Sequence, residues 1–478
     1  MNKKFAWAGV SIALTMSVLF TGGCSVARSS GPEGHLESKQ SRETGASRLE
    51  PEISREPEST AFSQETETAA VEIPAAAGSE LPSRYDARKD DRTAPVKNQG
   101  DLGTCWAFAS LLALESSLLP EESYDFSEDH MSHDPNFFLD QKSGGDYIMS
   151  MAYLLSWRGP VLEEEDPYGD GTSPEGLTAA KHVQEIQILP EYDREAIKTA
   201  VYRTGGVQSA LYTTLQRQEQ DSRYYNEETG AYYYSGTLPP NHDVVIIGWD
   251  DGYPAENFSE LPPDNGAFLC ENSWGTEFGE AGFFYVSYYD TNLGTTNLVY
   301  SGVEPADNYD RIYQSDLCGW LGQIGYGSET VWGANVYSAS GGAQQIRAAG
   351  FYAVDAGTEY EVSIVTDVPE QPTDADWRRL KSKKLGTVSG TLTYAGYYTI
   401  PLAEPVEVPE GGRFAVIVEL RTQGAVHPMA IEYDSGDGRC LVDITDGEGY
   451  LSADGDVWER VETEQECNLC LKAYSVLK

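Results

Sequence analysis

The hydrophobic pattern divides the chain into stretches of different character. An apolar run at residues 5–20 is followed by residues 25–80, which are rich in Ser, Glu, Thr, Ala and Pro and poor in large apolar side chains. A segment of this composition cannot bury enough surface to offset the entropy lost on folding. We therefore expect the folded part of the chain to begin near residue 81.

The first folded stretch contains one strongly predicted helix. Residues 106–115 are almost entirely apolar, and Gly100 and Gly103 break the chain shortly before them. This arrangement favours a buried helix with Cys105 in its first turn. The sulfur of Cys105 is then expected at the positive end of the helix dipole.

Strands are predicted further along the same stretch. Apolar runs at residues 244–249 and 267–269 are separated by residues 251–266, which are full of turn residues and read as a loop. The tyrosine-rich residues 224–234 contain an apolar run, a turn and a second apolar run. This pattern predicts a hairpin better than an aromatic binding stripe, although some rings could line a cleft.

The pattern changes again near Pro305. Residues 346–354, 360–366 and 413–420 are predicted to be strands, and proline and glycine residues concentrate between them at 399–414. Strands of this length with turn residues between them are typical of an antiparallel β-sandwich. We predict that residues 305–478 form such a domain.

Candidate chemistry comes from residues far apart in the sequence. A thiol attacks a carbonyl as a thiolate, and a cysteine ionises readily only beside a protonated imidazole or a helix N-terminus. In the predicted helix Cys105 would meet the second condition, and His242 would meet the first. A single cysteine in an apolar helix is most often structural. Gln99 and Asn272 change this interpretation, because together the four residues supply every polar group that such a reaction requires.

At these positions the chain resembles the papain-like cysteine peptidases, whose signature is Cys-Gly-Ser/Ala-Cys-Trp/Tyr with histidine and asparagine far downstream. The resemblance extends from about residue 81 to residue 300. It rests on residues 81–88, 95–108, 126–129, 144–145, 268–275 and 279–284. It implies an α+β fold in which residues 81–304 form a two-lobed peptidase domain, with one helical lobe and one lobe like a β-barrel.

The resemblance also implies a role for each site residue. Cys105 would be the nucleophile, and His242 would accept its proton and later protonate the leaving amine. Asn272 would orient the imidazole. Gln99 would donate its side-chain amide to the oxyanion, together with the Cys105 backbone N–H. Trp274 would cover the contact between Asn272 and His242 and exclude water.

The chain departs from the family pattern at two positions near Cys105. Leu102 stands where the signature has its first cysteine, so the usual disulfide of this loop is missing and we expect Leu102 to pack instead. Thr104 replaces the usual serine or alanine. Residues 25–80 also lack the helical periodicity of the inhibitory propeptide found in many relatives, so latency through a folded prosegment is not expected.

The remaining histidines offer no better base. His130 and His133, with Asp129 and Asp134 nearby, have the residue types of a metal site. No third ligand follows at a suitable spacing, and the segment matches a helix start in the family. We expect a structural or solvated role for both histidines, with no metal and no cofactor.

The beginning of the chain predicts export. Lys3 and Lys4 precede the apolar run, which is too short for a comfortable membrane span and ends just before Cys24. Small residues before Cys24 resemble a bacterial lipoprotein processing site, so residues 1–24 are predicted to be a signal peptide with lipid on Cys24. The alternative is a freely secreted form. If Cys24 carries lipid, residues 25–80 would be a disordered tether that holds the enzyme at the cell surface.

Charge and cysteine content agree with an exported protein. The formal charge of −43 in 478 residues disfavours binding to nucleic acid. Seven cysteines are too few for a disulfide scaffold. An exported setting permits pairing among Cys318, Cys440, Cys467 and Cys470, and the sequence leaves that pairing open. Cys467 and Cys470 lack partners for a zinc or redox site.

Residues 305–478 resemble the lectin-like domain that follows a papain-type domain in some bacterial and archaeal surface proteins. The match rests on residues 334–338 and 349–352 and on the order of the strands. Aromatic side chains in a sandwich are more often core than sugar platforms. No ligand residues are assigned, and the aromatic residues considered are Trp320, Trp332, Trp377, Tyr397 and Tyr398.

Two classes of function follow from the sequence. The first is an extracellular cysteine endopeptidase that cuts proteins or peptides through a thioester acyl-enzyme. The second is a surface adhesion or substrate-binding protein, with a possible carbohydrate ligand, whose papain-like domain is weak or inactive. The presence of Cys105, His242, Asn272 and Gln99 favours the first, because a binding protein has no need of all four. A transferase on the same fold is a third, weaker alternative.

Overall fold

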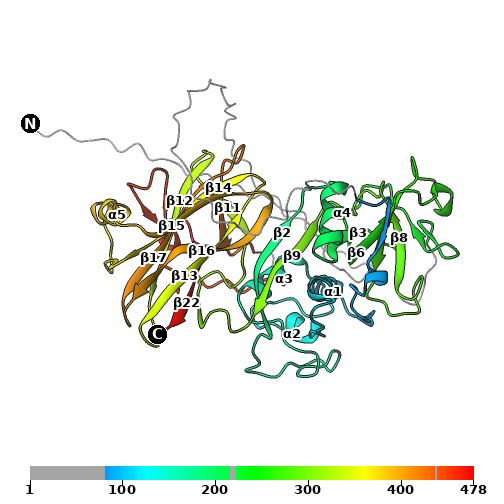
Figure 1. Cartoon of the computed structure of the whole chain (residues 1–478), viewed down its shortest axis with the longest axis horizontal. Helices are drawn as coiled ribbons and strands as arrows, with labels where there is room; N and C mark the ends of the chain where they lie inside the picture. Colours follow the sequence, from blue (N-terminus) through cyan, green and yellow to red (C-terminus); the bar gives the residue numbers. More distant parts are fainter. Residues whose placement is uncertain (1–80, 216–221, 437–438) are drawn as a thin grey trace, which may run out of the picture.

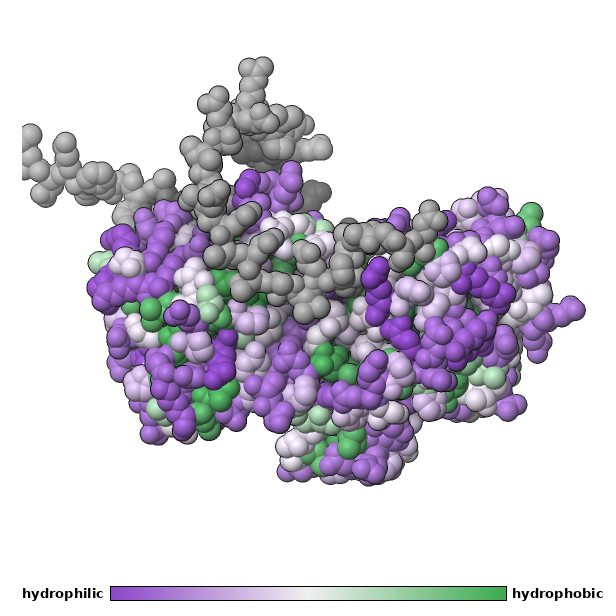
Figure 2. All heavy atoms as spheres, in the orientation of Figure 1, coloured by the Kyte–Doolittle hydropathy of each residue, from purple (hydrophilic) through white to green (hydrophobic). Residues whose placement is uncertain are grey.

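The computed structural model describes residues 81–215, 222–436 and 439–478, and the expectations for the signal peptide, Cys24 and the tether lie outside these residues. Figure 1 shows two lobes side by side, the first drawn in blue to green and the second in yellow to red. In the space-filling view of Figure 2, hydrophilic residues cover most of the visible surface of both lobes. In the described part of the chain, no helix combines the length and apolar character needed to cross a membrane.

The predicted helix at residues 106–115 is confirmed as α1 (Cys105–Leu118), which is buried along almost its whole length. It is enclosed because strands of the first lobe pack on one side of it and shorter helices on the other. The remaining helices are η1 (Ala87–Asp90), α2 (Glu128–Ser132), α3 (Tyr147–Leu155), α4 (Arg194–Arg203), η2 (Ala255–Asn257), α5 (Asp374–Lys381) and α6 (Val461–Glu464).

The strands of the first lobe are arranged in the order β2-β9-β3-β6-β7-β8-β5-β4, and β1 also pairs with β6. The predicted strands at 244–249 and 267–269 are confirmed as β6 and β7, and the predicted hairpin as the short pair β4 and β5. The bounds are β1 (Arg84–Asp86), β2 (Lys181–Ile188), β3 (Val207–Leu211), β4 (Tyr225–Asn226), β5 (Ala231–Tyr232), β6 (His242–Asp250), β7 (Ala267–Glu271), β8 (Phe283–Ser287) and β9 (Asn297–Pro305).

The second lobe is the predicted antiparallel sandwich, and the three predicted strands are confirmed as β13, β14 and β17. One layer has the order β15-β14-β17-β12-β19-β20 and the other β10-β22-β13-β16, with a small sheet β11-β18-β21 beside them. The bounds are β10 (Arg311–Tyr313), β11 (Gly322–Ile324), β12 (Thr330–Ser338), β13 (Gln344–Ala353), β14 (Thr358–Thr366), β15 (Leu385–Leu392), β16 (Ala395–Val408), β17 (Arg413–Arg421), β18 (Met429–Tyr433), β19 (Gly449–Ser452), β20 (Glu459–Arg460), β21 (Cys467–Leu469) and β22 (Leu471–Leu477).

The nearly continuous apolar run of β17 has a simple explanation, which is that both faces of the strand are covered. Phe414 and Val416 point into the core between the two layers. Ala415 and Ile417 alternate with them and face a smaller cluster that contains Trp377 of α5. Because successive side chains of a strand point to opposite faces, burial on both sides leaves no polar alternation.

The two lobes share one sheet, which the sequence did not predict. Strand β16 of the second lobe pairs antiparallel with β2 of the first, from Ala395 opposite Ile188 to Tyr398 opposite Glu185. The result is a 13-stranded sheet that runs from β10 in the sandwich to β4 in the first lobe. The two lobes are thus joined by backbone hydrogen bonds as well as by the chain itself.

Candidate active site

Two of the predicted site residues meet where neighbouring strands end. His242 is the first residue of β6, and Asn272 follows the last residue of its antiparallel neighbour β7. The imidazole Nε2 lies 2.8 Å from the Asn272 Oδ1, and that oxygen also accepts a hydrogen bond from the Ser273 backbone N–H at 2.8 Å. Because this amide N–H can only donate, the oxygen of Asn272 faces the imidazole, which then carries its proton on Nε2.

Trp274 lies against this pair. Its ring centroid lies 4.6 Å from that of His242, with the planes tilted by 30°. His242 and Asn272 are only 3% and 1% exposed. Burial lowers the pKa of His242 to about 4, although the hydrogen bond with Asn272 opposes the shift. An imidazolium at this position therefore needs an anionic neighbour to become stable at neutral pH.

Cys105 is fully buried and is the first residue of α1, the helix that packs against β6. The preceding Thr104 does not cap the helix with its side chain. Its hydroxyl instead shares a hydrogen bond of 2.7 Å with the Tyr168 hydroxyl. The start of α1 is thus held from outside the helix, by a residue of the loop between α3 and β2.

Gln99 joins the segment before Cys105 to the segment after Asn272. Its backbone N–H donates to the Ser273 carbonyl at 2.8 Å, and its side-chain oxygen accepts from the Ser273 hydroxyl at 2.7 Å. The side-chain nitrogen donates to the Leu102 carbonyl at 2.7 Å. A primary amide has two N–H donors, so the Gln99 nitrogen can make one hydrogen bond in addition to this one.

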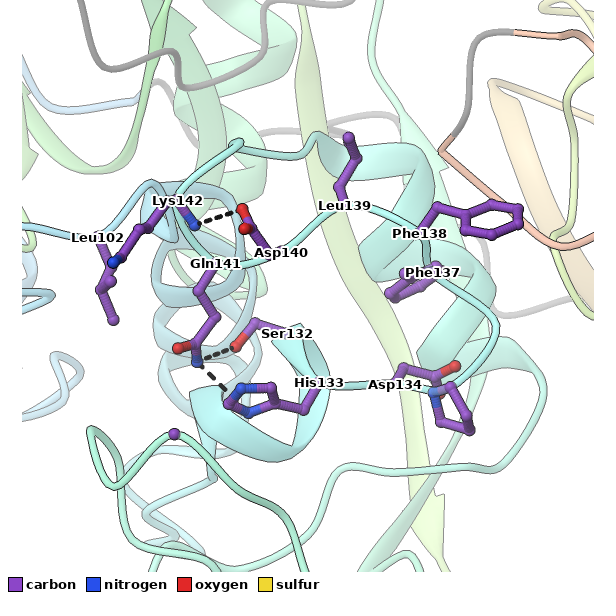
Figure 3. Close-up of a pocket in the computed structure, with 12 residues that line it drawn as sticks. Leu102, Ser132, His133, Asp134, Phe137, Phe138, Leu139, Asp140, Gln141 and Lys142 are labelled. Carbon is purple, nitrogen blue, oxygen red and sulfur yellow. Dashed lines mark hydrogen bonds between the residues drawn. The ribbon is translucent and has the colours of Figure 1, made fainter.

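The loop that lacks the family disulfide is anchored by its backbone. The Gly103 N–H donates to the Gln141 carbonyl at 2.6 Å, and the Tyr168 hydroxyl donates to the Gln99 carbonyl at 2.9 Å. Leu102 is only partly buried and lines an open pocket of about 440 Å³ formed mainly by residues 132–142 (Figure 3). The packing expected of Leu102 is thus partial, and backbone hydrogen bonds also hold this loop.

Two contributors to the site were missed by the sequence analysis. Ser273 fixes the Gln99 amide, and Tyr168 bonds to both Gln99 and Thr104. Ser273 lies beside Asn272 in a motif that was already recognised, so its position gave a signal. Tyr168 lies in a loop without periodicity, and only the folded chain brings it to the start of α1.

His130 and His133 make ordinary side-chain contacts. The His130 Nδ1 lies 2.8 Å from the Tyr153 hydroxyl, and burial lowers the pKa of His130. The His133 Nδ1 lies 3.5 Å from the Gln141 amide nitrogen. These contacts agree with the expected structural role.

The cysteines and aromatic residues of the second lobe are mostly in its interior. Among the described residues, five cysteines are unpaired thiols, and they are Cys270, Cys318, Cys440, Cys467 and Cys470. The aromatic residues considered as sugar platforms are all buried, which confirms that they are core residues: Trp320, Trp332, Trp377, Tyr397 and Tyr398.

Comparison with known proteins agrees with this architecture. Residues 81–303 match the model of the papain family of cysteine proteases, and residues 312–475 match that of a lectin-like domain. A structure of the clostridial cysteine protease Cwp84 after propeptide cleavage is 29% identical, with a TM-score of 0.73, and covers 83% of this chain and 100% of that chain. The cysteine protease and lectin-like domains of Cwp84, a surface layer associated protein of Clostridium difficile, are 28% identical, also with a TM-score of 0.73, over 84% of this chain and 90% of that chain.

Two curated relatives are similar to this chain over less than half of its length. Cathepsin K of Gallus gallus is 31% identical over 213 residues, which is 43% of this chain and 58% of that protein. The viral cathepsin of Epiphyas postvittana nucleopolyhedrovirus is 27% identical over 230 residues, 47% of this chain and 65% of the viral protein. The chain thus spans less than two thirds of these relatives.

The fold and the comparisons place the chain in the class of proteins in which a papain-like fold is followed by a β-rich lectin-like domain. Within that class, the two-domain architecture is similar to that of Cwp84 across most of the chain.

Proposed function

We propose that this protein is a cell-surface cysteine endopeptidase that hydrolyses peptide bonds through Cys105, His242 and Asn272. The observation that supports this most directly is the hydrogen bond between His242 and Asn272 beneath Trp274. The Cys105 helix packs on the strand that His242 begins, so the proposed nucleophile and base stand at the first residues of two elements in direct contact.

In the proposed reaction the Cys105 sulfur, having given its proton to His242, attacks the carbonyl carbon of the scissile peptide bond. The oxyanion accepts hydrogen bonds from the Cys105 backbone N–H and the remaining Gln99 N–H. The carbon–nitrogen bond then breaks, and the amine leaves with the proton from His242. Water then gives a proton to His242 and attacks the carbonyl carbon of the thioester. The carboxylic acid is released, and Cys105 leaves as a thiolate beside the protonated His242.

The neutral tautomer of His242 suits this sequence of proton transfers. With its proton on Nε2 held by Asn272, the ring keeps a lone pair on Nδ1 with which to accept the thiol proton. Because burial disfavours the charged ring, the imidazolium is stabilised mainly by the thiolate formed with it. Proton transfer and thiolate formation are therefore coupled.

The cell-surface location is part of the proposal. It is supported by the apolar run before Cys24 and by the likeness to Cwp84, a surface layer associated protein. Lipid on Cys24 and a tether at residues 25–80 would attach the enzyme to the outer face of a membrane. Proteins or peptides are the expected substrates, and the lectin-like domain would contact a cell-surface or carbohydrate ligand through residues other than its buried aromatics.

Alkylation tests the nucleophile directly. The reduced full-length chain is treated with a peptidyl epoxide of the kind that alkylates papain-type cysteines, and the labelled cysteine is identified by peptide mass mapping. We expect modification of Cys105 alone, lost in Cys105→Ala and His242→Ala. Cys440→Ser is the matched control, because Cys440 is a partly exposed thiol outside the site. Undiminished hydrolysis by Cys105→Ala would falsify the assignment.

A further inference from the structure

Three aspartates converge about one point near the start of α1. Asp129 comes from the first turn of α2, and Asp166 and Asp170 come from the loop between α3 and β2. Each offers a carboxylate oxygen, and these oxygens all lie within 4.8 Å of one another. Carboxylates so close repel one another unless a cation or protons lie between them.

A second observation points to a missing ligand. Asp166 is 1% exposed, and within the described residues neither of its carboxylate oxygens has a hydrogen-bond partner. A carboxylate buried without donors is costly. Its neighbour Asp129 is fully buried as well but is satisfied, because its oxygens accept from the Gln141 amide at 2.6 Å and the Gly169 N–H at 3.0 Å.

The cationic side chains nearby do not neutralise the cluster. Within the described part of the chain, no lysine or arginine forms an ion pair with any of the three aspartates. The His133 Nδ1 lies 4.0 Å from the Asp129 Oδ1. This contact reaches only one of the three aspartates, and His133 is positively charged only when its ring is protonated. The cluster therefore carries excess negative charge in a mostly buried place.

The ligand atoms select the kind of cation. All are oxygen atoms, which suits a hard divalent cation and not zinc or copper, for which cysteine and histidine are the usual ligands. The cluster is also open on one side, because Asp170 is exposed and the adjacent Gly171 lines the pocket of Figure 3, so water can complete the shell. Three carboxylates, two of them from one loop outside the helices and strands, together with several waters fit Ca²⁺ better than Mg²⁺, which demands near-ideal octahedral geometry.

We propose that Asp129, Asp166 and Asp170 form a calcium site that holds the loop carrying Tyr168 against the catalytic segment. This site departs from the sequence-based expectation of no metal. Tyr168 lies between two of the ligands, and its hydroxyl contacts the Gln99 carbonyl at 2.9 Å and the Thr104 hydroxyl at 2.7 Å. Its ring packs edge to face on Phe108 of α1, with centroids 4.8 Å apart.

The consequence for activity rests on the proposed function, whereas calcium binding does not. With the cation bound, Asp166 and Asp170 are fixed relative to α2, and Tyr168 between them is fixed against Gln99 and Thr104. Without the cation, repulsion among the carboxylates loosens this loop and the anchoring of the segment that leads to Cys105. Tyr168 is thus a positioning residue, not a catalytic one.

Calcium titration of the full-length protein tests the site. The protein is first stripped with EGTA, and binding is then followed by calorimetry and by the shift in Tm as CaCl₂ is added. We expect saturable binding and a rising Tm for the parent protein. Asp166→Asn should weaken binding by about tenfold or more, because it removes one of the three negative charges that hold the cation. Glu175→Gln, an exposed acid of the same loop, is the matched control and should bind as the parent does.

The stability of Asp166→Asn in EGTA separates a calcium site from a merely structural acid. If the carboxylate serves a cation, the amide should be at least as stable as the parent without calcium and less stable with it, since Asn removes an unpaired buried charge. A Tm for Asp166→Asn that lies below the parent equally in both conditions would overturn the proposal. Absence of any calcium-dependent Tm shift in the parent would overturn it as well.

A variant of Tyr168 tests whether calcium binding affects catalysis through this residue. Tyr168→Phe keeps the ring on Phe108 but removes both hydroxyl contacts. It should bind calcium like the parent while its kcat no longer rises with calcium. If kcat of Tyr168→Phe still rises with calcium as in the parent, the positioning role is wrong. A parent that binds calcium but hydrolyses nothing would contradict the proposed function and leave the calcium site standing.

Discussion

The Oδ1 atom of Asn272 lies 2.8 Å from the Nε2 atom of His242, and the two residues stand at the adjoining ends of strands β7 and β6. The antiparallel register brings them together, because the last residue of β7 pairs with Val245, three positions into β6. The imidazole is thereby fixed by the sheet and covered by Trp274, with little rotational freedom of its own.

Substitutions of the three proposed catalytic residues should distinguish those that react from the one that orients the imidazole. We expect Cys105→Ala and His242→Ala to abolish turnover with the fold intact. Asn272→Ala removes one hydrogen bond to a group that becomes charged, worth about 1.5–3 kcal/mol. That loss corresponds to a fall in kcat/KM of about 10- to 100-fold, measured with a peptide substrate. Equal loss in all three variants would contradict the orienting role.

The titration of His242 should depend on Cys105. Burial holds the pKa of this imidazole at about 4 when no anion lies beside it. In Cys105→Ala no thiolate can form, so we expect His242 to stay neutral down to about this pH. In the parent protein, a thiolate partner should raise its pKa. NMR titration of labelled histidine measures both values, and an identical pKa in the two proteins would rule out the ion pair.

Glu271 should make the protein less stable as pH rises. Burial raises the pKa of its carboxyl from 4.5 to about 8, and the charge of Glu115 adds to the shift. Between these two values the folded protein keeps a proton that the unfolded chain releases, so stability declines by up to about 1.4 kcal/mol per pH unit. Glu271→Gln has no carboxyl to titrate at this position. The free energy of unfolding of the variant, relative to that of the parent, should therefore rise across this window.

Urea unfolding at a series of pH values measures this effect. The matched control is Glu280→Gln, because the Glu280 side chain is 70% exposed and its unfolding curves should follow those of the parent. Curves for Glu271→Gln that run parallel to those of the parent throughout the window would show that the Glu271 carboxyl does not hold the proton.

Gly396 should be essential where the two lobes join. Its φ is +135°, and a Cβ there would lie 2.1 Å from the Ile186 carbonyl oxygen of β2. Gly396→Ala therefore forces β16 and β2 apart, and we expect a large loss of stability with faster limited proteolysis. Gly411→Ala is the control, since Gly411 also has a positive φ of +73° but no atom within 4 Å of an added Cβ. It should lose only about 1–2 kcal/mol.

Cys318 and Cys440 should form a disulfide when the protein is oxidised. A hydrogen bond with the Cys440 thiol raises the pKa of Cys318, so the two sulfur atoms are close in the reduced protein. Oxidised glutathione would accept the two electrons and receive the two thiol protons. Peptide mapping without reductant should show this link, and Cys440→Ser should abolish it. A link between Cys467 and Cys470 instead would contradict the assignment.

Sequence reasoning succeeded where a feature depends on neighbouring residues. The apolar run of α1, the strands β6 and β7 and the motif around Asn272 are local patterns, and all lie where the sequence placed them. It failed where distant segments meet. Nothing in residues 395–398 indicates β2 as a partner, and nothing around Tyr168 indicates a contact with Gln99. The convergence of Asp129 with Asp166 likewise depends on how α2 meets the following loop.

The shared sheet has a consequence for how the protein is made. Until residue 395 and the strands that follow it have been synthesised, β2 has no neighbouring strand on one side. Its unpaired backbone N–H and C=O groups on that side can then pair with a strand of another chain. The β2 edge is thus the last part of the amino-terminal lobe to fold, because only β16 of the second lobe covers it. A prematurely terminated chain would retain the residues of the active site but carry an open edge, which exposes it to aggregation and to quality-control proteases.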